Sequence, residues 1–220
     1  MHVAIAGNIG SGKTTLTRML SSHYGWTPQY ESVISNPYLE DYYKDIHRWS
    51  FNLETYFLSE RFKDMLELQR QDKDIIQDRT IFEGVHVFVA NNKEMGNMSD
   101  RDYKTYMDLF DLMMRFTRVP DLMIYLRSGI PHLVEQIQKR GREYEQSISL
   151  EYLQGLNNRY EDFIMNKYPG KVLIIDVNNL DFLNRPKDFE FITNHIDSLL
   201  FGLFPMNEQE KVVAIKKYQT

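Results

Sequence analysis

The chain has 220 residues, with 26 Lys and Arg against 31 Asp and Glu, so its formal net charge is −5 at pH 7. This length suits one domain with a single hydrophobic core, and the negative charge argues against a surface that coats nucleic acid. The absence of cysteine excludes disulfides, thiolate nucleophiles and cysteine-based metal sites. No apolar run approaches the length of a membrane span, and the first motif begins at residue 7. We therefore expect no signal peptide, no membrane partner and a cytoplasmic protein.

Short apolar runs that end at polar residues alternate with longer helical patterns along the chain. We expect strands at residues 2–6, 28–31, 75–77, 122–126 and 172–175. We expect helices at residues 13–23, 38–71, 84–91, 100–117, 131–140, 149–167 and 186–203. The alternation predicts an α/β three-layer fold, with a parallel sheet flanked by helices. We expect one domain over residues 1–204 and a docked or frayed tail over residues 205–220.

Residues Gly7–Thr14, GNIGSGKT, follow an apolar run and match the phosphate-binding pattern G-x-x-x-x-G-K-[ST] at every fixed position. In this pattern the glycines let backbone N–H groups surround a polyphosphate, Lys13 adds a cation for the outer phosphates, and the Thr14 hydroxyl can ligate Mg²⁺. The motif predicts binding of a nucleoside triphosphate. The alternative is a glycine-rich turn between a strand and a helix, with no ligand. The residues expected to contact the phosphates are Gly7, Asn8, Ile9, Gly10, Ser11, Gly12, Lys13, Thr14 and Thr15.

Acidic and basic residues follow the later strands, where a parallel sheet binds its ligands. They are Glu31 after the second strand, Asp78-Arg79-Thr80 after the third, Arg127 after the fourth and Asp176 after the fifth. Asp78 occupies the position from which phosphate-loop proteins hold Mg²⁺, or else it forms an ion pair with Arg79 that closes the strand end without a ligand. For Glu31 the spacing leaves open both a role in the site and a role in capping the next helix.

The segment Gln138–Gln146, QKRGREYEQ, carries two arginines on either side of a glycine. As structure, it is a helix that ends at Gly141 with cations in its last turn, which favours the helix dipole. As function, Arg140 and Arg142 form a mobile lid that folds over the phosphates and neutralises charge during transfer. The phosphate-binding motif favours the lid.

In their order and spacing, five segments closely resemble the deoxynucleoside kinases of the deoxycytidine, deoxyguanosine and deoxyadenosine kinase family, bacterial branch. The segments are Gly7–Thr14, Glu31, Arg48–Phe51 (RWSF), Asp78–Phe82 (DRTIF) and Arg140–Gln146 (RGREYEQ). The resemblance implies a P-loop kinase fold with a five-stranded parallel sheet and an arginine-containing lid, usually as a homodimer through a helix bundle. It also implies transfer of the γ-phosphoryl group of ATP to the 5′-hydroxyl of a deoxynucleoside. It favours the functional interpretation of both Glu31 and the lid.

At the reacting centre, the resemblance implies that Glu31 accepts the proton of the 5′-hydroxyl. A carboxylate suits this task, because phosphoryl transfer needs orientation and a modest proton acceptor more than a strong base. Arg79 is expected to hold the 5′-oxygen and the transferring phosphoryl group. Beside it, Asp78 and Thr14 hold the metal ion. Together with Lys13, Glu31 and Arg79 are the expected catalytic residues.

For the nucleoside, the resemblance implies that Tyr43 and Glu145 clamp the sugar 3′-hydroxyl, which couples substrate binding to lid closure. It implies that Phe88 stacks on the base. It also implies that Asp176, with the two residues after it, lies near the adenine of ATP. Without the resemblance, Tyr43 and Phe88 are more typical of core aromatics at helical spacing.

The chain departs from the family pattern at four positions. Gln136 replaces a further lid arginine, and Asn36 replaces a tryptophan that lines the sugar and base pocket in many members. Glu54 replaces the glutamine that reads the base. Gly84 replaces an aspartate that commonly follows the motif arginine by five residues.

These departures bear on base preference, because Glu54, Phe57 and Arg61 share one face of a predicted helix and can contact one base together. An ionised glutamate only accepts hydrogen bonds, which suits the N1–H and 2-amino groups of guanine, while Arg61 can donate to O6 and N7. The loss of an aspartate at Gly84 leaves Arg61 available for that contact. The sequence predicts a preference for deoxyguanosine over deoxyadenosine. The alternative is a pair between Glu54 and Arg61, with the base read elsewhere.

We conclude from the sequence that the chain is a Mg²⁺- and ATP-dependent deoxynucleoside kinase of nucleotide salvage, with small-molecule substrates and no nucleic-acid partner. A broad or deoxyadenosine/deoxycytidine-preferring kinase is the alternative within the family. A nucleoside-monophosphate kinase would need extra cations for the acceptor phosphate, where this chain has Glu31. A regulatory ATP-binding switch would not release ADP in response to an acceptor.

Overall fold

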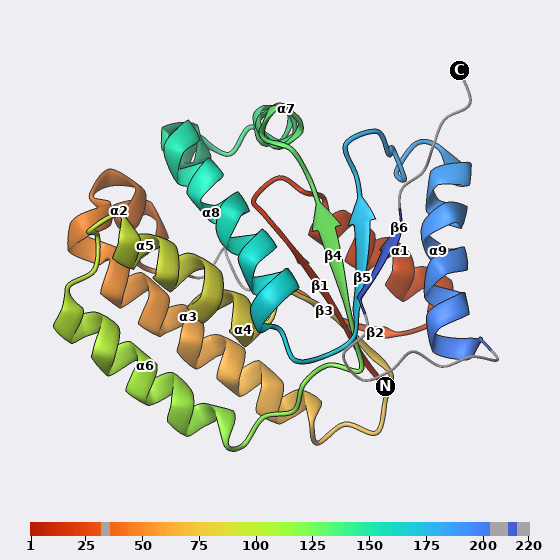
Figure 1. Ribbon diagram of the computed structural model, residues 1–220, viewed down its shortest axis with the longest axis horizontal. Coiled ribbons are helices and arrows are strands. Elements are labelled where there is room, and N and C mark those ends of the chain that lie inside the picture. The colour runs from red at the N-terminus through yellow and green to blue at the C-terminus, as the bar shows by residue number, and fades with distance from the viewer. Residues whose placement is uncertain (32–35, 203–210, 215–220) are drawn as a thin grey trace.

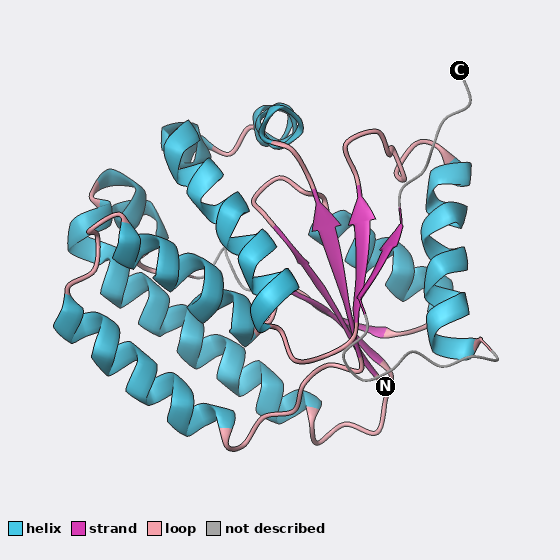
Figure 2. Ribbon diagram, viewed as in Figure 1, coloured by secondary structure: helices cyan, strands magenta, loops and turns pink. Residues whose placement is uncertain are grey.

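A parallel sheet of six strands lies between two helical layers in the computed structural model, which describes residues 1–31, 36–202 and 211–214 (Figure 2). The strands are β1 (His2–Gly7), β2 (Thr27–Gln29), β3 (Ile75–Asp78), β4 (Leu122–Arg127), β5 (Val172–Asp176) and β6 (Lys211–Ala214). Their order across the sheet is β2-β3-β1-β4-β5-β6, and every neighbouring pair is parallel. The predicted three-layer α/β fold is confirmed. The predicted number of five strands was wrong.

The sixth strand comes from the segment that was expected to be a docked or frayed tail. β6 pairs with β5 from Val172 opposite Lys211 to Ile175 opposite Ala214. Its four residues, KVVA, are too few to show an alternation of apolar and polar side chains. The strand is therefore defined by its neighbour β5 rather than by its own pattern.

The helical segments follow the predicted order, with several changes in their bounds (Figure 1). They are α1 (Lys13–Tyr24), α2 (Leu39–Lys44), α3 (Ile46–Leu68), α4 (Ile81–Glu83), the π-helix η1 (Gly84–Val89), α5 (Ala90–Glu94), α6 (Asp100–Met114), α7 (Ile130–Arg140), the 3₁₀-helix η2 (Glu143–Ser147), α8 (Leu150–Asp162), the π-helix η3 (Phe163–Lys167) and α9 (Pro186–Phe201). None of these helices is long and apolar enough to cross a membrane.

The largest departure is the helix expected over residues 38–71, which is two helices that meet at Asp45. The backbone of Asp45 leaves the helical region, with φ −147° and ψ 83°, and its side chain accepts a hydrogen bond of 3.0 Å from the Arg48 N–H. Asp45 thus ends α2 and caps α3. No glycine or proline marks the break, so helical spacing alone could not reveal it.

The two faces of the sheet carry separate apolar cores, because successive strand residues point to opposite sides. One core joins Val3, Ile5, Ile124 and Leu126 to Leu16 and Leu20 of α1 and Ile192 and Ile196 of α9. The other joins Ala6, Met123 and Tyr125 to the side chains of α3, η1, α6 and α8. Figure 1 shows these two helical layers on either side of the strands. The four central strands β3, β1, β4 and β5 are buried on both faces, as expected for a parallel sheet, whereas the edge strands β2 and β6 are partly exposed.

The register of the central strands brings the functional segments together at one edge of the sheet. Ile5 of β1 lies opposite Asp78, the last residue of β3, and Gly7 lies opposite Leu126 of β4. The chain runs from β1 outward to β2 and back to β3, and then crosses to β4 on the other side of β1. Such a reversal of strand order is where α/β sheets bind ligands.

Candidate active site

The phosphate-binding loop leaves β1 in a conformation that needs glycine. Gly10 and Gly12 have φ angles of 86° and 93°, in the left-handed region that favours glycine. A Cβ atom would lie 2.8 Å from the Leu133 carbonyl oxygen at Gly10, and 2.9 Å from Cζ of Phe182 at Gly12. The loop is therefore held tightly between α7 and the segment that follows β5.

Lys13, the first residue of α1, points back over this loop. Its Nζ donates a hydrogen bond of 3.0 Å to the carbonyl oxygen of Asn8. Burial lowers the pKa of Lys13 to about 8, and the positive charge of Arg79 adds to this shift. The Asn8 side chain in turn donates to the Leu153 carbonyl oxygen at 3.1 Å and to Asn157 Oδ1 at 3.2 Å. The loop is thus tied to α8.

Thr14 and Asp78, the two residues expected to hold a metal ion, lie in contact. The Thr14 hydroxyl donates to Asp78 Oδ2 at 2.5 Å. The other carboxylate oxygen, Oδ1, is buried and has no hydrogen-bond partner among the residues that the structure describes. Burial also raises the pKa of Asp78. A hydroxyl beside a partly unsatisfied carboxylate fits Mg²⁺, which takes one or two protein oxygens and completes its shell with phosphate and water.

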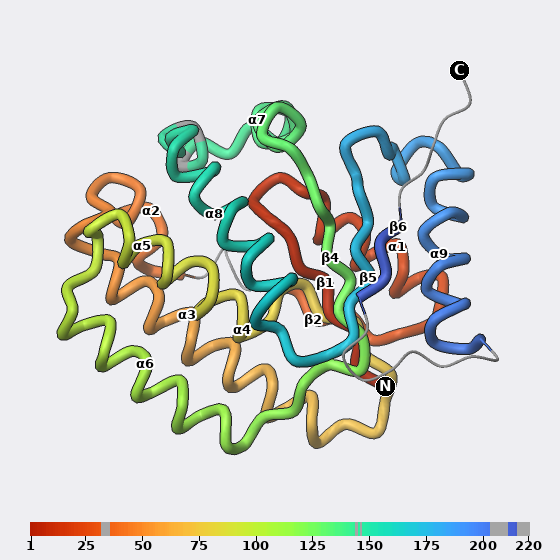
Figure 3. Tube along the Cα trace, viewed as in Figure 1, coloured from red at the N-terminus to blue at the C-terminus, as the bar shows by residue number. Residues whose placement is uncertain are grey.

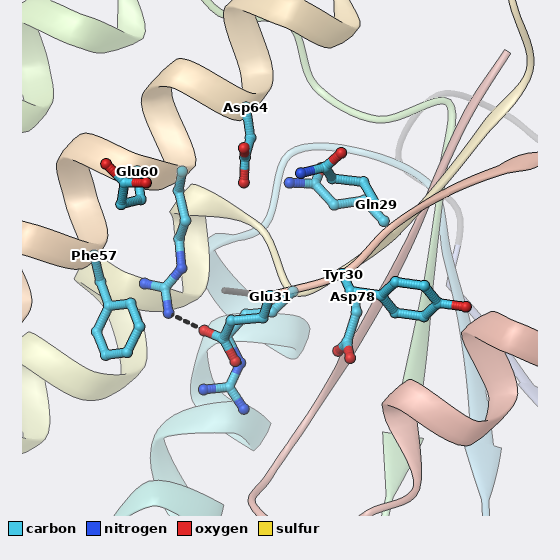
Figure 4. Close-up of a pocket in the computed structure, with 10 residues that line it drawn as sticks. Gln29, Tyr30, Glu31, Phe57, Glu60, Asp64 and Asp78 are labelled. Atoms are coloured by element: carbon cyan, nitrogen blue, oxygen red, sulfur yellow. Dashed lines mark hydrogen bonds and ion pairs between the residues drawn. The ribbon is translucent and has the colours of Figure 1, made fainter. Parts of the chain in front are cut away.

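The Glu31 carboxylate lies between two buried arginines (Figure 4). Arg61 Nη2, from α3, donates to Glu31 Oε1, and Arg79 Nε lies 3.5 Å from Glu31 Oε2. Burial works to raise the pKa of Glu31, but the charges of Arg79 and Arg61 outweigh it and bring that pKa to about 2. Glu31 does not cap the next helix, because α2 begins at Leu39 with Tyr38 before it.

Arg79 has a left-handed backbone, with φ 68°, which no other non-glycine residue within the described ranges shares. Strain of this kind is often found at functional sites. Its guanidinium stacks over Phe88, 4.5 Å from the ring centroid, and its Nε lies 4.0 Å from the buried Glu83. Within the described chain, its ion pairs are with Glu31 and Glu83 rather than with Asp78. The strand-end ion pair considered from the sequence is therefore not formed.

A cavity of about 270 Å³ opens beside these groups. Its lining includes Lys13, Thr14 and Asp78 from the phosphate side, and all eight residues expected to bind the nucleoside: Glu31, Tyr43, Glu54, Phe57, Arg61, Arg79, Phe88 and Glu145. Arg140 and Arg142 also line it. The structure thus brings together side chains that are far apart in the sequence. The individual roles assigned to them stay predictions.

Glu54 is 2% exposed in this cavity and accepts a hydrogen bond of 3.2 Å from Asn92 Nδ2. Burial raises the pKa of Glu54 to about 8, although the positive charges of Arg61 and Arg79 oppose the shift. No ion pair joins Glu54 to Arg61 within the described ranges, since Arg61 pairs with Glu31. The alternative of a Glu54–Arg61 pair is therefore not realised.

The lid segment joins α7 to α8 (Figure 3). Its residues Arg140, Arg142 and Glu145 line the cavity. α7 ends at Gly141, whose φ of 67° is the left-handed conformation expected for a helix end. Arg140 donates to both oxygens of Glu145, at 3.0 Å and 2.5 Å, and Arg142 donates to one of them at 3.4 Å. The helix ends where expected and its arginines line the cavity, while the role of the segment as a mobile lid over the phosphates stays a prediction.

Several residues expected in the site do not line this cavity, among them the phosphate-loop residues Gly7, Asn8, Gly10, Ser11, Gly12 and Thr15. Asp176 does not line the cavity, and its carboxylate accepts hydrogen bonds of 3.0 Å and 2.9 Å from the backbone and side chain of Asn178. Asn36, expected in the pocket wall, is also outside the lining, and its Oδ1 accepts a hydrogen bond of 2.9 Å from the Tyr38 N–H. The predicted adenine contact of Asp176 stays untested.

The sequence did not point to a hydrogen-bonded chain that supports Glu54. Tyr42 donates to Asn92 Oδ1 at 3.1 Å, and its hydroxyl lies 2.9 Å from that of Tyr152. Tyr42 and Tyr152 line the cavity together with Glu54. Tyr42 and Tyr43 are adjacent in the sequence, and Tyr42 is the more deeply buried of the two. Its part in this hydrogen-bonded network follows from that burial. No motif or spacing carries that information.

The fold and the site together are those of a P-loop kinase. Residues 3–201 match the family model described as deoxynucleoside kinase. The chain is 37% identical over 200 residues to a deoxyadenosine/deoxycytidine kinase of Bacillus subtilis, covering 90% of this chain and 92% of the relative. It is 33% identical over 206 residues to a deoxyguanosine kinase of the same organism, covering 90% and 97%.

Solved structures give the same result. A deoxyadenosine kinase from M. mycoides with bound dATP superposes with a TM-score of 0.80 at 33% identity, over 90% of this chain and 100% of that chain. This chain therefore belongs to the deoxynucleoside kinase family and is a phosphotransferase, as the resemblance implied. The family assignment supports ATP as the phosphoryl donor and a nucleoside as the acceptor.

Proposed function

We propose that this protein transfers the γ-phosphoryl group of ATP, with Mg²⁺, to the 5′-hydroxyl of a purine deoxynucleoside. The observation that carries the proposal is that one cavity is lined by residues of the phosphate loop, by Glu31 and by two arginines at the end of α7 and in the lid. These residues are Lys13, Thr14, Glu31, Arg140 and Arg142. In the reaction, the 5′-oxygen forms a bond to the γ-phosphorus as the bond from that phosphorus to the bridging oxygen of ADP breaks. Mg²⁺, when bound, would neutralise charge on the phosphate oxygens.

Each described group has a task in this reaction. Glu31 accepts the proton that leaves the 5′-hydroxyl, and its two arginine contacts fix the carboxylate in one orientation. Lys13 and Arg79 supply positive charge where the transferring group becomes more negative. Thr14 and Asp78 hold the metal ion through a hydroxyl and a carboxylate oxygen.

The test measures ADP release with ATP and Mg²⁺ across the four deoxynucleosides, their ribose analogues and the matching monophosphates. We expect release only with a deoxynucleoside, and a fall in kcat of about 100-fold or more for Glu31→Gln, with a smaller change in KM. Glu67→Gln, an exposed glutamate on α3, is the matched control. ADP release without an acceptor, or only with monophosphates, contradicts the proposal.

For the base, we propose that Glu54, in its ionised form, favours deoxyguanosine over deoxyadenosine. Its buried carboxylate in the cavity accepts from Asn92 and, when ionised, is an acceptor for the two adjacent N–H donors of guanine. The relatives include deoxyguanosine kinases as well as deoxyadenosine/deoxycytidine kinases, so their names do not determine the base preference. The proposal therefore rests on the residues of the pocket. Competition among deoxyguanosine, deoxyadenosine and deoxycytidine at a pH above about 8, where Glu54 is ionised, tests it. A clear preference of the wild type for either competitor, or an unchanged ranking in Glu54→Gln, contradicts the assignment.

We also propose a homodimer. α6 forms the outermost helix of the larger layer in Figure 1, and its Leu112 is 53% exposed. A single exposed leucine is ordinary on a protein surface, so the support for the homodimer is the resemblance to the deoxynucleoside kinases. Light scattering during gel filtration should give a mass of two chains for the wild type and of one chain for Leu112→Lys. One chain for the wild type rules the homodimer out.

A further inference from the structure

Arg61 reaches Glu31 from a position that depends on a glycine. Its side chain is 6% exposed, its guanidinium stacks over Phe57 with 4.8 Å to the ring centroid, and its Nη2 donates to Glu31. Its other nitrogens, Nε and Nη1, are buried and have no hydrogen-bond partner among the described residues. Glu31 is therefore the group that holds the charged end of Arg61 in place.

Gly84 provides the space for this arrangement. A Cβ atom at Gly84 would lie 2.7 Å from Arg61 Nη1 and 3.3 Å from the Tyr106 hydroxyl. The backbone of Gly84 is helical, with φ −52° and ψ −53°, so position 84 itself accepts any L-residue without strain. The absence of a side chain at position 84 leaves room for the Arg61 guanidinium, whereas the backbone conformation there does not require glycine.

We propose that Arg61, seated against Gly84, is a positioning residue that orients the Glu31 carboxylate, so that residue 84 sets the rate of turnover through Arg61. This rests on the proposed kinase function. Arg61 contacts the Oε1 atom of Glu31, and Arg79 contacts the Oε2 atom of the same carboxylate. With Arg61 displaced, the carboxylate keeps only the longer contact of 3.5 Å to Arg79 and is free to turn away from the 5′-hydroxyl.

Position 84 gives a test that separates this role from a folding defect. Replacing a helical glycine with alanine favours the helix and offsets part of the cost of moving the buried Arg61 guanidinium, so the Tm of Gly84→Ala is measured beside kcat to establish that the variant is folded at the assay temperature. Its Cβ meets the end of a flexible side chain, which moves. We expect Gly84→Ala to lower kcat by roughly 3- to 10-fold with little change in the KM for the nucleoside, and Arg61→Gln to lower kcat by about 10-fold or more. Arg61→Lys, which keeps a cation, should recover part of the loss.

A double-mutant cycle identifies the path of the effect. In an Arg61→Gln background, Gly84→Ala should change kcat by less than about twofold, because the residue through which it acts is gone. Tyr106→Phe removes the second neighbour of the new Cβ, and Gly84→Ala should keep its effect in that background. Lys63→Gln, which removes an exposed cation on the same helix, is the control and should leave kcat unchanged.

Three outcomes overturn the proposal. They are a Gly84→Ala effect that persists in the Arg61→Gln background, an effect confined to KM, and an unchanged kcat in both single variants. An effect confined to KM would mean that Arg61 acts on nucleoside binding instead. Failure of the proposed kinase function is distinguishable, because the wild type would then release no ADP with any deoxynucleoside.

Discussion

Arg140 holds Glu145 with two hydrogen bonds, of 3.0 Å and 2.5 Å, one to each carboxylate oxygen. The bidentate pair joins the end of α7 to the 3₁₀-helix η2 across Gly141, at the edge of the cavity. A carboxylate held so rigidly is well placed to accept a hydrogen bond from a ligand. The predicted partner is the sugar 3′-hydroxyl.

The first prediction concerns that hydroxyl. Glu145→Ala and Tyr43→Phe should each lower kcat/KM for a 3′-hydroxyl substrate much more than for its 3′-deoxy analogue, because each removes a partner of the hydroxyl. Steady-state kinetics with both substrates measures the difference. Glu151→Ala, an exposed glutamate in the first turn of α8 outside the lid segment, is the control. Equal losses with both substrates would indicate a disturbed lid and not a lost clamp.

The second prediction concerns the metal ion. Asp78→Asn keeps the shape of the side chain but removes its charge, so the Mg²⁺ concentration for half-maximal activity should rise about 10-fold or more. A titration of activity with Mg²⁺ at saturating ATP measures this. Asp74→Asn, near the opposite end of β3, lies in an exposed pair with the amino terminus and should leave the titration unchanged. An unaltered Mg²⁺ requirement in Asp78→Asn would remove Asp78 from the metal site.

The third prediction is a pH-dependent base preference. The pKa of Glu54 is raised to about 8 by burial, against the opposing charges of Arg61 and Arg79 and with a further rise from Glu31. Below that pH the carboxyl group is protonated and can donate as well as accept, as adenine requires. Above it, the ionised group only accepts, as guanine requires. The ratio of kcat/KM for deoxyguanosine to that for deoxyadenosine should therefore rise as pH increases through about 8.

Glu54→Gln is the control for this third prediction, because glutamine does not titrate. The ratio should be independent of pH in that variant. If the wild-type ratio is also flat between pH 6.5 and roughly 8.5, ionisation of Glu54 does not govern base choice.

The fourth prediction concerns stability and follows from the same group. An unfolded chain ionises Glu54 near its ordinary pKa of 4.5, whereas the folded protein keeps it protonated up to about 8. The folded state then binds the extra proton, so the free energy of unfolding falls as pH rises between these values. Glutamine does not ionise, so the free energy of unfolding of Glu54→Gln should not fall with pH for this reason. Its Tm should exceed that of the wild type by more at pH 8 than at pH 5, with Glu67→Gln showing no such difference.

The sequence predicted well what depends on local pattern. The phosphate loop and the ends of β1, β3 and β4 could be placed from apolar runs followed by glycine or charge. The break at Asp45 and the strand β6 could not, because a single cap and four residues carry little periodic signal. Tertiary packing determines both the break at Asp45 and the formation of β6.

The site shows the same division. Helical spacing correctly put Glu54, Phe57 and Arg61 on one face of α3, and all three line the cavity. Spacing could not indicate that Arg61 pairs with Glu31, a residue 30 positions earlier, or that Asn92 supports Glu54. Such contacts join α3 to the residue Glu31 beyond β2 and to α5, which only the tertiary fold brings together. No property of the individual segments encodes them.

The parallel pairing of β6 with β5 has a practical consequence for handling the protein. Because all strands run the same way, Ala214 lies at the edge of the sheet that carries the phosphate loop, whereas His2 starts β1 at the opposite edge (Figure 1). Immobilisation through Val213, which is 47% exposed near that end of β6, would bring a solid support toward the catalytic edge. Attachment at Met1 would point the cavity away from the support, although it alters the pair between the amino terminus and Asp74. For surface-based binding measurements, the amino-terminal attachment is the better orientation.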